Sequence, residues 1–424
     1  MFRRMSRRAW LQIAGGSLVA GGAGAACYRA RQRTIRLGLL GAGIRGGELA
    51  NTVKETGWFP IKGQLVAVCD ADRSRADRLR SQYAPSAAVT DDFRRVLARD
   101  DIEAVLVATP DHWHAAMETE ALRAGKHVYA EKPLALTIAE GQHLVEAVQA
   151  SDRVFLVGTW QRSDRLFQLA CTLVRNGRLG KLRRISITIP GNLAGGPFAN
   201  RPVPPSLDWQ KWLGPAPSAE YCPERFAHFR QWFEYAGGTM TDWGAHHVDI
   251  AHWAMDIKDS GPQEISAQAT LPRIANGYNT PAQFQVDMKY PNGVLVNVCS
   301  SATEASLVFE GDEGRLRVNR KRITGTPVDE LARSPLPPGA VWVGHRYRSW
   351  VDRELTHLRH FLDCIVTGEP PISDVVSQHR TATACHLANI AMRLERSVKW
   401  DPRKEAFIDD AQAAKMVGRQ SRAI

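Results

Sequence analysis

Residues 35–46 read Ile35-Arg36-Leu37-Gly38-Leu39-Leu40-Gly41-Ala42-Gly43-Ile44-Arg45-Gly46. The mostly apolar first half is typical of a buried strand, and the glycines that follow permit a tight turn into a helix. Such a turn lets the backbone approach a pyrophosphate, and the free N–H groups at the helix start bind the anion. The alternative is a plain tight turn. The nucleotide contacts predicted here are Gly41, Gly43, Ile44, Arg45 and Gly46.

The same alternation continues outward to about residue 160. Short apolar runs are separated by helical patterns, and the runs lie at 65–69, 104–108, 127–130 and 154–158. Apolar runs that alternate with helices indicate a parallel α/β sheet. We therefore predict a nucleotide-binding domain over residues 34–160.

Asp70 directly follows the second apolar run. In this kind of fold an acid at that point accepts hydrogen bonds from both adenosine ribose hydroxyls and repels a 2′-phosphate, which favours NAD. Arg73 and Arg75 lie close enough to bind a 2′-phosphate, so NADP stays open as an alternative cofactor. The other interpretation is that both arginines are solvated residues on a helix face and do not contact the cofactor.

Two further segments follow strands of the predicted sheet. After the run 104–108 comes Thr109-Pro110-Asp111-His112-Trp113-His114. Because ligands of such sheets bind at the carboxyl ends of the strands, Thr109 and Pro110 are expected to line the cofactor's riboses. His114 is expected either to contact the cofactor or to cap and pack the next helix.

The second segment is Glu131-Lys132-Pro133, after the run 127–130. An ammonium beside the reactive ring of a nicotinamide would hydrogen-bond a substrate hydroxyl and stabilise negative charge on its oxygen, so Lys132 is a predicted catalytic residue. Glu131 would orient it or touch ribose. The alternative is a surface lysine before a turn, and the Lys132–Pro133 peptide is predicted to be cis.

Downstream, residues 237–249 place Asp242 and His246 four residues apart. On a helix they share one face, so the imidazole would accept a proton while the carboxylate fixes its tautomer. Together with His247, Asp249 and His252 the pair also reads as a metal cluster. Proton transfer needs no metal here, so no metal is predicted.

The second half of the chain changes pattern. A Pro/Gly-rich stretch, 190–217, is long enough to be a functional loop. Apolar alternation then predicts antiparallel strands at 264–271, 282–290, 293–301, 307–310 and 315–319, followed by helices at 354–366 and 377–395. We predict a substrate and oligomerisation domain over 161–400 and a surface tail over 401–424. The candidate substrate contacts are Trp160, Gln161, Arg162, His228, Arg230 and His247.

The N-terminus reads as an export signal. Ser6-Arg7-Arg8-Ala9-Trp10-Leu11-Gln12 is similar to a twin-arginine consensus, and a weakly apolar stretch, 13–26, follows. That stretch is too short for a transmembrane helix. We predict a signal and linker over residues 1–33, and a periplasmic or secreted protein. Cys27 offers a lipid anchor as an alternative to cleavage, and an uncleaved basic tail is the remaining interpretation.

Composition narrows the class of protein. The chain has 424 residues, 44% apolar and 23% charged, which suits a soluble globular protein of two domains. Its net charge is +11, but residues 1–33 contribute seven arginines and no acid. No basic-aromatic strip argues for nucleic acid. None of the seven cysteines has a metal-binding spacing, so most are expected to be small buried side chains.

These motifs together resemble the glucose–fructose oxidoreductase / inositol dehydrogenase / rhizopine-catabolism (Gfo/Idh/MocA) family. The resemblance rests on residues 41–46, 108–114, 131–133 and 242–249, and it covers the chain from Ile35 to about Trp400. It implies a Rossmann domain, then a C-terminal α/β domain with a large open, mostly antiparallel sheet that often forms the oligomer surface. It also implies roles for Lys132 beside the nicotinamide, for His246 as general base and for Asp242 as its orienter.

The resemblance implies NAD(P)-dependent oxidation or reduction of a sugar, cyclitol or related polyol. Because free NAD is scarce outside the cytoplasm, an exported enzyme is expected to carry its cofactor inside the folded protein. A retained cofactor must be regenerated in place, which leaves open a redox-neutral reaction such as epimerisation or glycoside cleavage. A non-catalytic sugar or nucleotide sensor is the alternative from another class.

Overall fold

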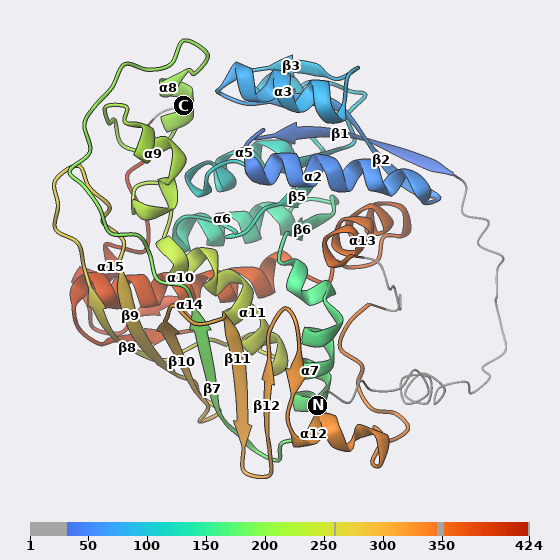
Figure 1. The fold of residues 1–424 in the computed structure, drawn as a ribbon, viewed down its shortest axis with the longest axis vertical. Helices are drawn as coiled ribbons and strands as arrows, with labels where there is room; N and C mark the ends of the chain where they lie inside the picture. The colour runs from blue at the N-terminus through green and yellow to red at the C-terminus, as the bar shows by residue number, and fades with distance from the viewer. Residues whose placement is uncertain (1–31, 258–259, 346–351, 423–424) are drawn as a thin grey trace.

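The structure is a computed structural model that describes residues 32–257, 260–345 and 352–422. It contains two sheets stacked along the long axis of the molecule (Figure 1). The first is parallel throughout, with six strands in the order β3-β2-β1-β4-β5-β6. Its strands are β1 (Arg33–Leu40), β2 (Ile61–Cys69), β3 (Ala88–Thr90), β4 (Ala104–Val107), β5 (His127–Ala130) and β6 (Phe155–Val157).

Helices connect these strands, and the carboxyl ends of the strands meet along one edge of the sheet. They are α2 (Ile44–Glu55), α3 (Arg73–Tyr83), α4 (Phe93–Leu97), α5 (Asp111–Arg123) and α6 (Ile138–Gln149). Thr137 and Glu140 form a capping box that starts α6. The predicted parallel nucleotide-binding domain is confirmed, and the short strand β3 is the one element of its sheet that the apolar pattern missed.

The second sheet has nine strands in the order β13-β12-β11-β7-β10-β9-β8-β14-β15. The pair of β7 and β10 is parallel and the other pairs are antiparallel, so the predicted mostly antiparallel sheet is confirmed. The strands are β7 (Leu182–Ile189), β8 (Glu264–Thr270), β9 (Gln283–Lys289), β10 (Leu295–Ser300), β11 (Ser306–Gly311), β12 (Arg315–Val318), β13 (Ile323–Thr324), β14 (Val398–Asp401) and β15 (Ala406–Phe407).

One face of this sheet is buried and the other is open. Helices α7 (Arg165–Arg175), α11 (Gly244–Ala254) and α14 (Val375–Leu394) pack on the buried face, where they share one apolar core with alternate strand residues (Figure 1). The intervening strand residues, such as Arg184, Gln285 and Asn297, remain at least partly exposed. This period of two is what a sheet with one solvated face requires.

The remaining described helices connect or cap these layers. They are η1 (Thr56–Trp58), η2 (Trp160–Ser163), α8 (Trp209–Leu213), α9 (Pro223–Ala227), η3 (Phe229–Gln231), α10 (Gly238–Asp242), α12 (Thr326–Asp329), η4 (Glu330–Ala332), α13 (Arg353–Thr367) and α15 (Ala411–Ala414).

The two domains share their outer layers. Helix α13 belongs to the C-terminal half of the chain, yet it packs on the parallel sheet, where Leu358 and Phe361 join the same core as Leu37. The rings of Phe361 and Tyr129 meet edge to face at 5.7 Å. A boundary at residue 160 therefore separates the two sheets but not the helices that cover them.

The expected surface tail has structure of its own. Residues 406–407 form β15, which pairs with β14 at the edge of the nine-stranded sheet. Further along, Arg419 pairs with Glu140 of α6, and Arg422 donates to the carbonyl of Gly214. The described residues 401–422 therefore join the sheet edge to the N-terminal domain.

The export signal and Cys27 lie outside the described residues. Among the residues that are described, no helix is long and apolar enough to cross a membrane. The described cysteines are all free thiols, and five of the six are buried: Cys69, Cys171, Cys222, Cys364 and Cys385.

Glu118 on α5 is the most unfavourably placed carboxyl group of the described chain. It is fully buried, and neither carboxylate oxygen has a hydrogen-bond partner. Burial, with the nearby charge of Glu140, raises the pKa of Glu118 well above its ordinary value. The group is therefore held in its neutral form, at a cost in stability.

Replacing Glu118 with methionine should stabilise the protein. An unpartnered buried polar group costs about 1–3 kcal/mol, and methionine fills a similar volume without it. Because the folded-state pKa is raised, the wild-type protein loses stability as pH rises above the ordinary glutamate pKa. The gain, measured by urea unfolding, should therefore be larger at pH 7 than at pH 4. Glu120→Met, on the solvent side of α5, is the control, and equal changes in both variants would contradict the assignment.

Candidate active site

The glycine turn after β1 is shaped for close approach of a ligand. Gly41 has φ +97°, and a Cβ atom there would stand 2.5 Å from the carbonyl oxygen of Ala108. A Cβ on Gly46 would stand 2.0 Å from the carbonyl oxygen of Gly41. Only glycine fits at either place. The turn is fixed by Asp70, whose carboxylate accepts from the backbone N–H groups of Ala42 at 2.7 Å and Asp72 at 2.8 Å.

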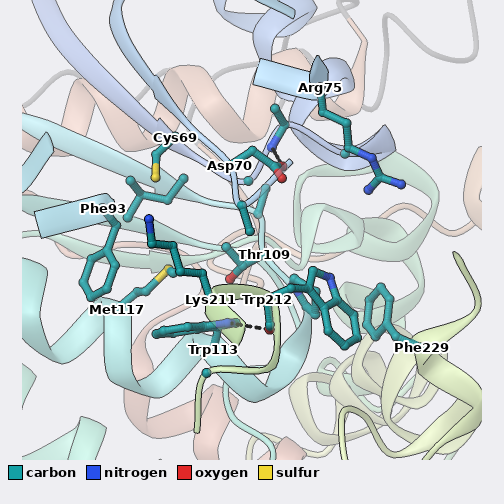
Figure 2. Close-up of a pocket in the computed structure, with 18 of the residues that line it drawn as sticks. Cys69, Asp70, Arg75, Phe93, Thr109, Trp113, Met117, Lys211, Trp212 and Phe229 are labelled. Carbon is teal, nitrogen blue, oxygen red and sulfur yellow. Dashed lines mark hydrogen bonds between the residues drawn. The ribbon is translucent and has the colours of Figure 1, made fainter. Parts of the chain in front are cut away.

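A cleft of about 1090 Å³ opens above this turn, along the carboxyl edge of the parallel sheet. Figure 2 shows Asp70 and Thr109 on the sheet side of it, with Trp212 and Phe229 facing them. Most of the cofactor contacts predicted from the sequence line it, namely Gly41, Gly43, Ile44, Arg45, Asp70, Thr109, Pro110, Glu131 and Lys132. Gly46 and His114 are not among the lining residues.

The cleft has a cover that comes from the C-terminal half of the chain. We call residues 203–230 the cover segment; α8 and α9 belong to it. It meets the nucleotide-binding domain through a β-bridge between Asp72 and Leu207, and through backbone bonds Arg73 N–H to Ser206 and Asp208 N–H to Ala71, both 2.9 Å. Lys211 adds an ion pair to Asp91 at 2.6 Å.

Buried aromatic rings hold the cover segment together. Trp209 and Trp212 stack at 4.6 Å, and Tyr221 and Tyr235 meet them edge to face. The Trp212 carbonyl accepts from the side chains of both His112 and Trp113, at 2.9 Å each (Figure 2). Most of the tryptophans in this region are therefore core residues, as expected from their type.

Lys132 leaves the end of β5 and crosses to the C-terminal domain. Its ammonium forms an ion pair with the Asp242 carboxylate and also donates to the Asp242 carbonyl. Arg230 approaches the same carboxylate at 3.4 Å. Burial acts to raise the pKa of Asp242, but the charges of Lys132 and Arg230 outweigh it and lower that pKa to about 2. The Lys132–Pro133 peptide is cis, as predicted.

The expected pairing of Asp242 with His246 is wrong. The Asp242 carboxylate is directed to Lys132 and Arg230, and no hydrogen bond among the described residues joins it to the His246 ring. The reason is competition for the carboxylate, because Lys132 takes it as an ion pair and also donates to the Asp242 carbonyl. Asp242 therefore orients Lys132 instead.

His246 lies one helical turn after Asp242, and the residue is 4% exposed. Its ring packs against Trp160 with centroids 5.3 Å apart, and Nδ1 has no hydrogen-bond partner. Burial, and then the charges of Lys132 and Arg320, lower the pKa of His246 well below its ordinary value. The imidazole is therefore neutral at physiological pH and remains able to accept a proton.

Glu131 and Arg45 form a second ion pair at the cleft. Arg45 donates to Glu131 at 2.6 Å and also pairs with Glu354 of α13 at 2.7 Å. One Glu131 oxygen accepts from the Lys132 backbone N–H at 3.2 Å. Glu131 therefore positions the backbone of Lys132 rather than its ammonium.

His114 contacts the protein instead of the cleft. Its ring nitrogens face the carbonyls of Pro133 at 2.7 Å and Thr109 at 2.9 Å, and the side chain is 1% exposed. It joins the loops after β4 and β5. The structure thus favours the packing interpretation over cofactor contact.

Five of the six expected substrate contacts are not among the residues that line the cleft. Arg162 forms a fully buried ion pair with Asp249, which also accepts from Gln378 at 2.7 Å. His247 is fully buried with Nδ1 at the Trp243 carbonyl, Gln161 is fully buried, and His228 is exposed away from the cleft lining. These corrections share one cause: sequence position at a domain junction does not tell which side of the backbone faces the site.

The fifth is Trp160, which is buried against His246. Arg230 alone of the six lines the cleft. Asp242 and His246, the predicted catalytic partners of Lys132, are not among its lining residues. The proposed metal cluster is not formed, since the described residues contain no group of three suitable ligands and Asp249 is occupied by Arg162.

The sequence interpretation missed three features. Asp111, the first residue of α5, lines the cleft while 2% exposed, and its Oδ2 is buried without a partner. The cover segment supplies Lys211, Trp212 and Phe229 to the lining. Arg320 reaches the vicinity of His246 from the turn after β12. Of these three features, only the cover segment was indicated by the sequence, through the unusual length of the Pro/Gly-rich stretch 190–217.

Three features of the cleft itself fit a bound dinucleotide. The glycine turn leaves room that any Cβ would fill, and Asp70 ends β2 beside it. Ile44, at the start of α2, is 88% exposed although it lines the cleft. An apolar side chain left uncovered at that point is what a bound ligand would shield.

The fold is a parallel α/β domain joined to a mostly antiparallel sheet, with a cleft at the carboxyl edge of the parallel sheet that Lys132 lines. The family follows from comparisons with known proteins. Residues 35–159 match the model of an oxidoreductase family with an NAD-binding Rossmann fold, and residues 195–338 and 349–424 match the C-terminal α/β domain of the same family. The chain belongs to the Gfo/Idh/MocA family of NAD-binding oxidoreductases.

Two curated relatives each match about a third of the chain. Inositol 2-dehydrogenase of Salmonella typhimurium is 31% identical over 153 residues, 35% of this chain and 44% of the relative. A glycosyl hydrolase family 109 protein of a Shewanella species is 31% identical over 157 residues, 35% of this chain and 33% of the relative. The chain therefore matches less than half the length of these relatives.

A solved structure shares the whole fold. The WlbA dehydrogenase of Bordetella pertussis, in complex with NADH and UDP-GlcNAcA, superposes with a TM-score of 0.66 at 17% identity. The match covers 87% of this chain and 99% of that one. At this identity the likeness shows the fold alone.

Lys132→Ala should abolish most hydride transfer while leaving nucleotide binding intact. The ammonium pairs with Asp242 rather than with a residue of the glycine turn, and loss of one charge-stabilising donor costs a factor of about 10²–10³ in rate. Turnover and nucleotide affinity of the purified variant measure the two effects, with the exposed Lys54→Ala as control. Turnover close to that of the wild-type protein would refute the role.

Proposed function

We propose that this protein transfers hydride between a hydroxyl group of a sugar, cyclitol or related polyol and a tightly bound nicotinamide. The observation that carries the proposal is the ion pair of Lys132 with Asp242. It places an ammonium at the end of a nucleotide cleft, within electrostatic reach of a neutral, buried imidazole. A donor for oxygen and an acceptor for its proton are the two groups that alcohol oxidation requires.

The residues divide the work as follows. Gly41, Asp70 and the residues after β4 would hold NAD, which when bound supplies the hydride acceptor. Lys132 donates a hydrogen bond to the substrate oxygen and stabilises the negative charge that develops there. His246 accepts the hydroxyl proton. Asp242 holds the ammonium through its ion pair with Lys132, and Arg230 in turn pairs with the Asp242 carboxylate.

The pH dependence of oxidation tests His246. Because its pKa is lowered, the imidazole stays neutral and the rate should remain flat as pH falls through the ordinary value of 6.5. The acid limb should appear only at clearly lower pH. His246→Asn should lose most activity together with that limb, and the exposed His143→Asn should change neither. A variant at position 246 that kept the rate and the profile would place the base elsewhere.

The cover segment supports retention of the cofactor. It is tied to the nucleotide-binding domain by a β-bridge and to the C-terminal residues by Arg422, which donates to Gly214 at 3.0 Å and to Ser218 at 2.9 Å. A dinucleotide in the cleft would lie between the sheet edge and this segment. Release would require these contacts to open.

Nucleotide retention is the direct test. Wild-type protein should keep close to one nucleotide per chain through gel filtration, identified by mass spectrometry after denaturation. The double variant Lys211→Ala/Arg422→Ala should release it about tenfold faster, since the lost contacts are worth about 1–2 kcal/mol. Arg403→Ala, an exposed arginine of the same C-terminal region, is the control. Wild-type protein that purifies without nucleotide would contradict retention.

A redox-neutral reaction is the second candidate. It is favoured by the proposed retention, because a retained cofactor must return to its starting state within each cycle, and by the likeness of about a third of the chain to a glycosyl hydrolase family 109 protein. Reduced nicotinamide that accumulates when a single sugar is added would favour net oxidation. A sensor would hold nucleotide and turn over no sugar.

We also propose export through the twin-arginine pathway and assembly through the open face of the nine-stranded sheet. Arg7 and Arg8 in the N-terminal sequence support export, and the periplasmic fraction of an Arg7→Lys/Arg8→Lys variant tests it. The polar open face supports assembly, and light scattering of the purified protein measures its oligomeric state.

A further inference from the structure

Arg320 stands at the tip of the turn between β12 and β13. The buried side chain of Asn319 fixes this turn by accepting from the backbone N–H groups of Lys321 at 2.9 Å and Arg322 at 2.8 Å. The Arg320 carbonyl in turn accepts from Arg353 at 3.2 Å. The backbone that carries Arg320 is thus held on both sides.

The side chain is held as firmly as the backbone. Its guanidinium lies between the rings of Trp160 and Trp243, 4.5 Å from each centroid. Nε donates to Gln161 Oε1 at 3.0 Å, and the Gln161 amide donates to the His246 carbonyl at 3.2 Å. Gln161 therefore joins Arg320 to the segment that carries the general base. A cation stacked between two indoles is preorganised for one orientation.

This guanidinium has no ion-pair partner among the described residues, although Asp242, Glu354 and Asp164 act on it from farther away. No described carboxylate lies within ion-pair distance of it, whereas Arg353, stacked on the same Trp160 ring at 4.4 Å, pairs with Asp164 at 3.0 Å. Burial and the charge of Arg353 lower the pKa of Arg320 to about 10. Arg320 stays charged at neutral pH, and its terminal nitrogens hydrogen-bond no described residue.

Arg320 also lies close to His246, because the Trp160 ring contacts both the Arg320 guanidinium and the His246 ring. Its charge lowers the pKa of both Asp242 and His246, so it is within electrostatic reach of the ion pair and of the base. A neutral polyol needs no unpaired cation at that place, and holding one there against desolvation is unfavourable. The missing partner is an anion that arrives with the substrate.

We propose that Arg320 binds a carboxylate of the substrate, and that the substrates are sugar acids such as uronic or aldonic acids. This inference rests on the proposed function, whose substrate class it narrows. A carboxylate matches the two terminal nitrogens of a guanidinium in a bidentate arrangement. A phosphate dianion is less favourable there, because the carboxylates of Asp242 and Glu354, which lie near enough to interact with Arg320, would repel its second charge.

Binding of D-glucuronate and D-glucose to the nucleotide-loaded protein tests the assignment, since the two differ by a carboxylate at one carbon. Isothermal titration in a buffer free of carboxylates and phosphate should show glucuronate binding at least tenfold tighter. Arg320→Met should weaken glucuronate about 10- to 100-fold and leave glucose within about twofold. Arg320→Lys should restore only part of the loss. Arg322→Met, which removes an exposed charge from the same turn, should match the wild-type protein.

Several results would overturn the assignment: equal binding of the two sugars by the wild-type protein, equal losses for both in Arg320→Met, or tighter binding of D-glucose 6-phosphate than of glucuronate. Should Arg320→Met fail to fold, as judged by circular dichroism, the Arg320→Lys variant carries the same comparison. Because the readout is binding, it is separate from turnover. Glucuronate that binds through Arg320 without being oxidised would refute hydride transfer and leave the carboxylate assignment standing.

Discussion

The ion pair between Lys132 and Asp242 is the interaction on which the rest of the site depends. It joins the end of β5 in one domain to the end of α10 in the other. Two charges taken out of water are tolerated only when each is well partnered, and here Arg230 and the Asp242 carbonyl complete the set.

The same ion pair bears on His246. Because the Asp242 carboxylate is directed to Lys132 and Arg230, it forms no hydrogen bond with the imidazole among the described residues. The ring packs against Trp160 and lies within electrostatic reach of Lys132 and Arg320. Burial and these positive charges both favour the neutral ring, which is the form that can accept a proton.

The two domains are interdependent to an unusual degree. Helix α13 from the C-terminal half packs on the parallel sheet, and the cover segment forms one wall of the nucleotide cleft. Arg45 of the glycine turn pairs with Glu354 of α13, so the start of the nucleotide site is itself held by the second domain. Neither the cleft nor its acid–base end is complete in one domain, which ties cofactor binding to the packing between them.

The sequence by itself determined the local features of this protein. The glycine turn, the alternation of strands and helices, the capping box at Thr137 and most of the nine-stranded sheet follow from short-range patterns of residue type. Such patterns report which face of a strand or helix is apolar. These patterns predicted the family, and they predicted correctly that Lys132 and Asp70 lie at the edge of the sheet.

Only the tertiary structure decided which polar groups meet. Arg162 pairs with Asp249 instead of contacting substrate, and Asp242 pairs with Lys132 instead of His246. Arg320 reaches Gln161, beside His246, from a hairpin more than seventy residues after His246 in the sequence. Partner choice among charged side chains depends on distance and desolvation after the domains pack, and neither is encoded in spacing along the chain.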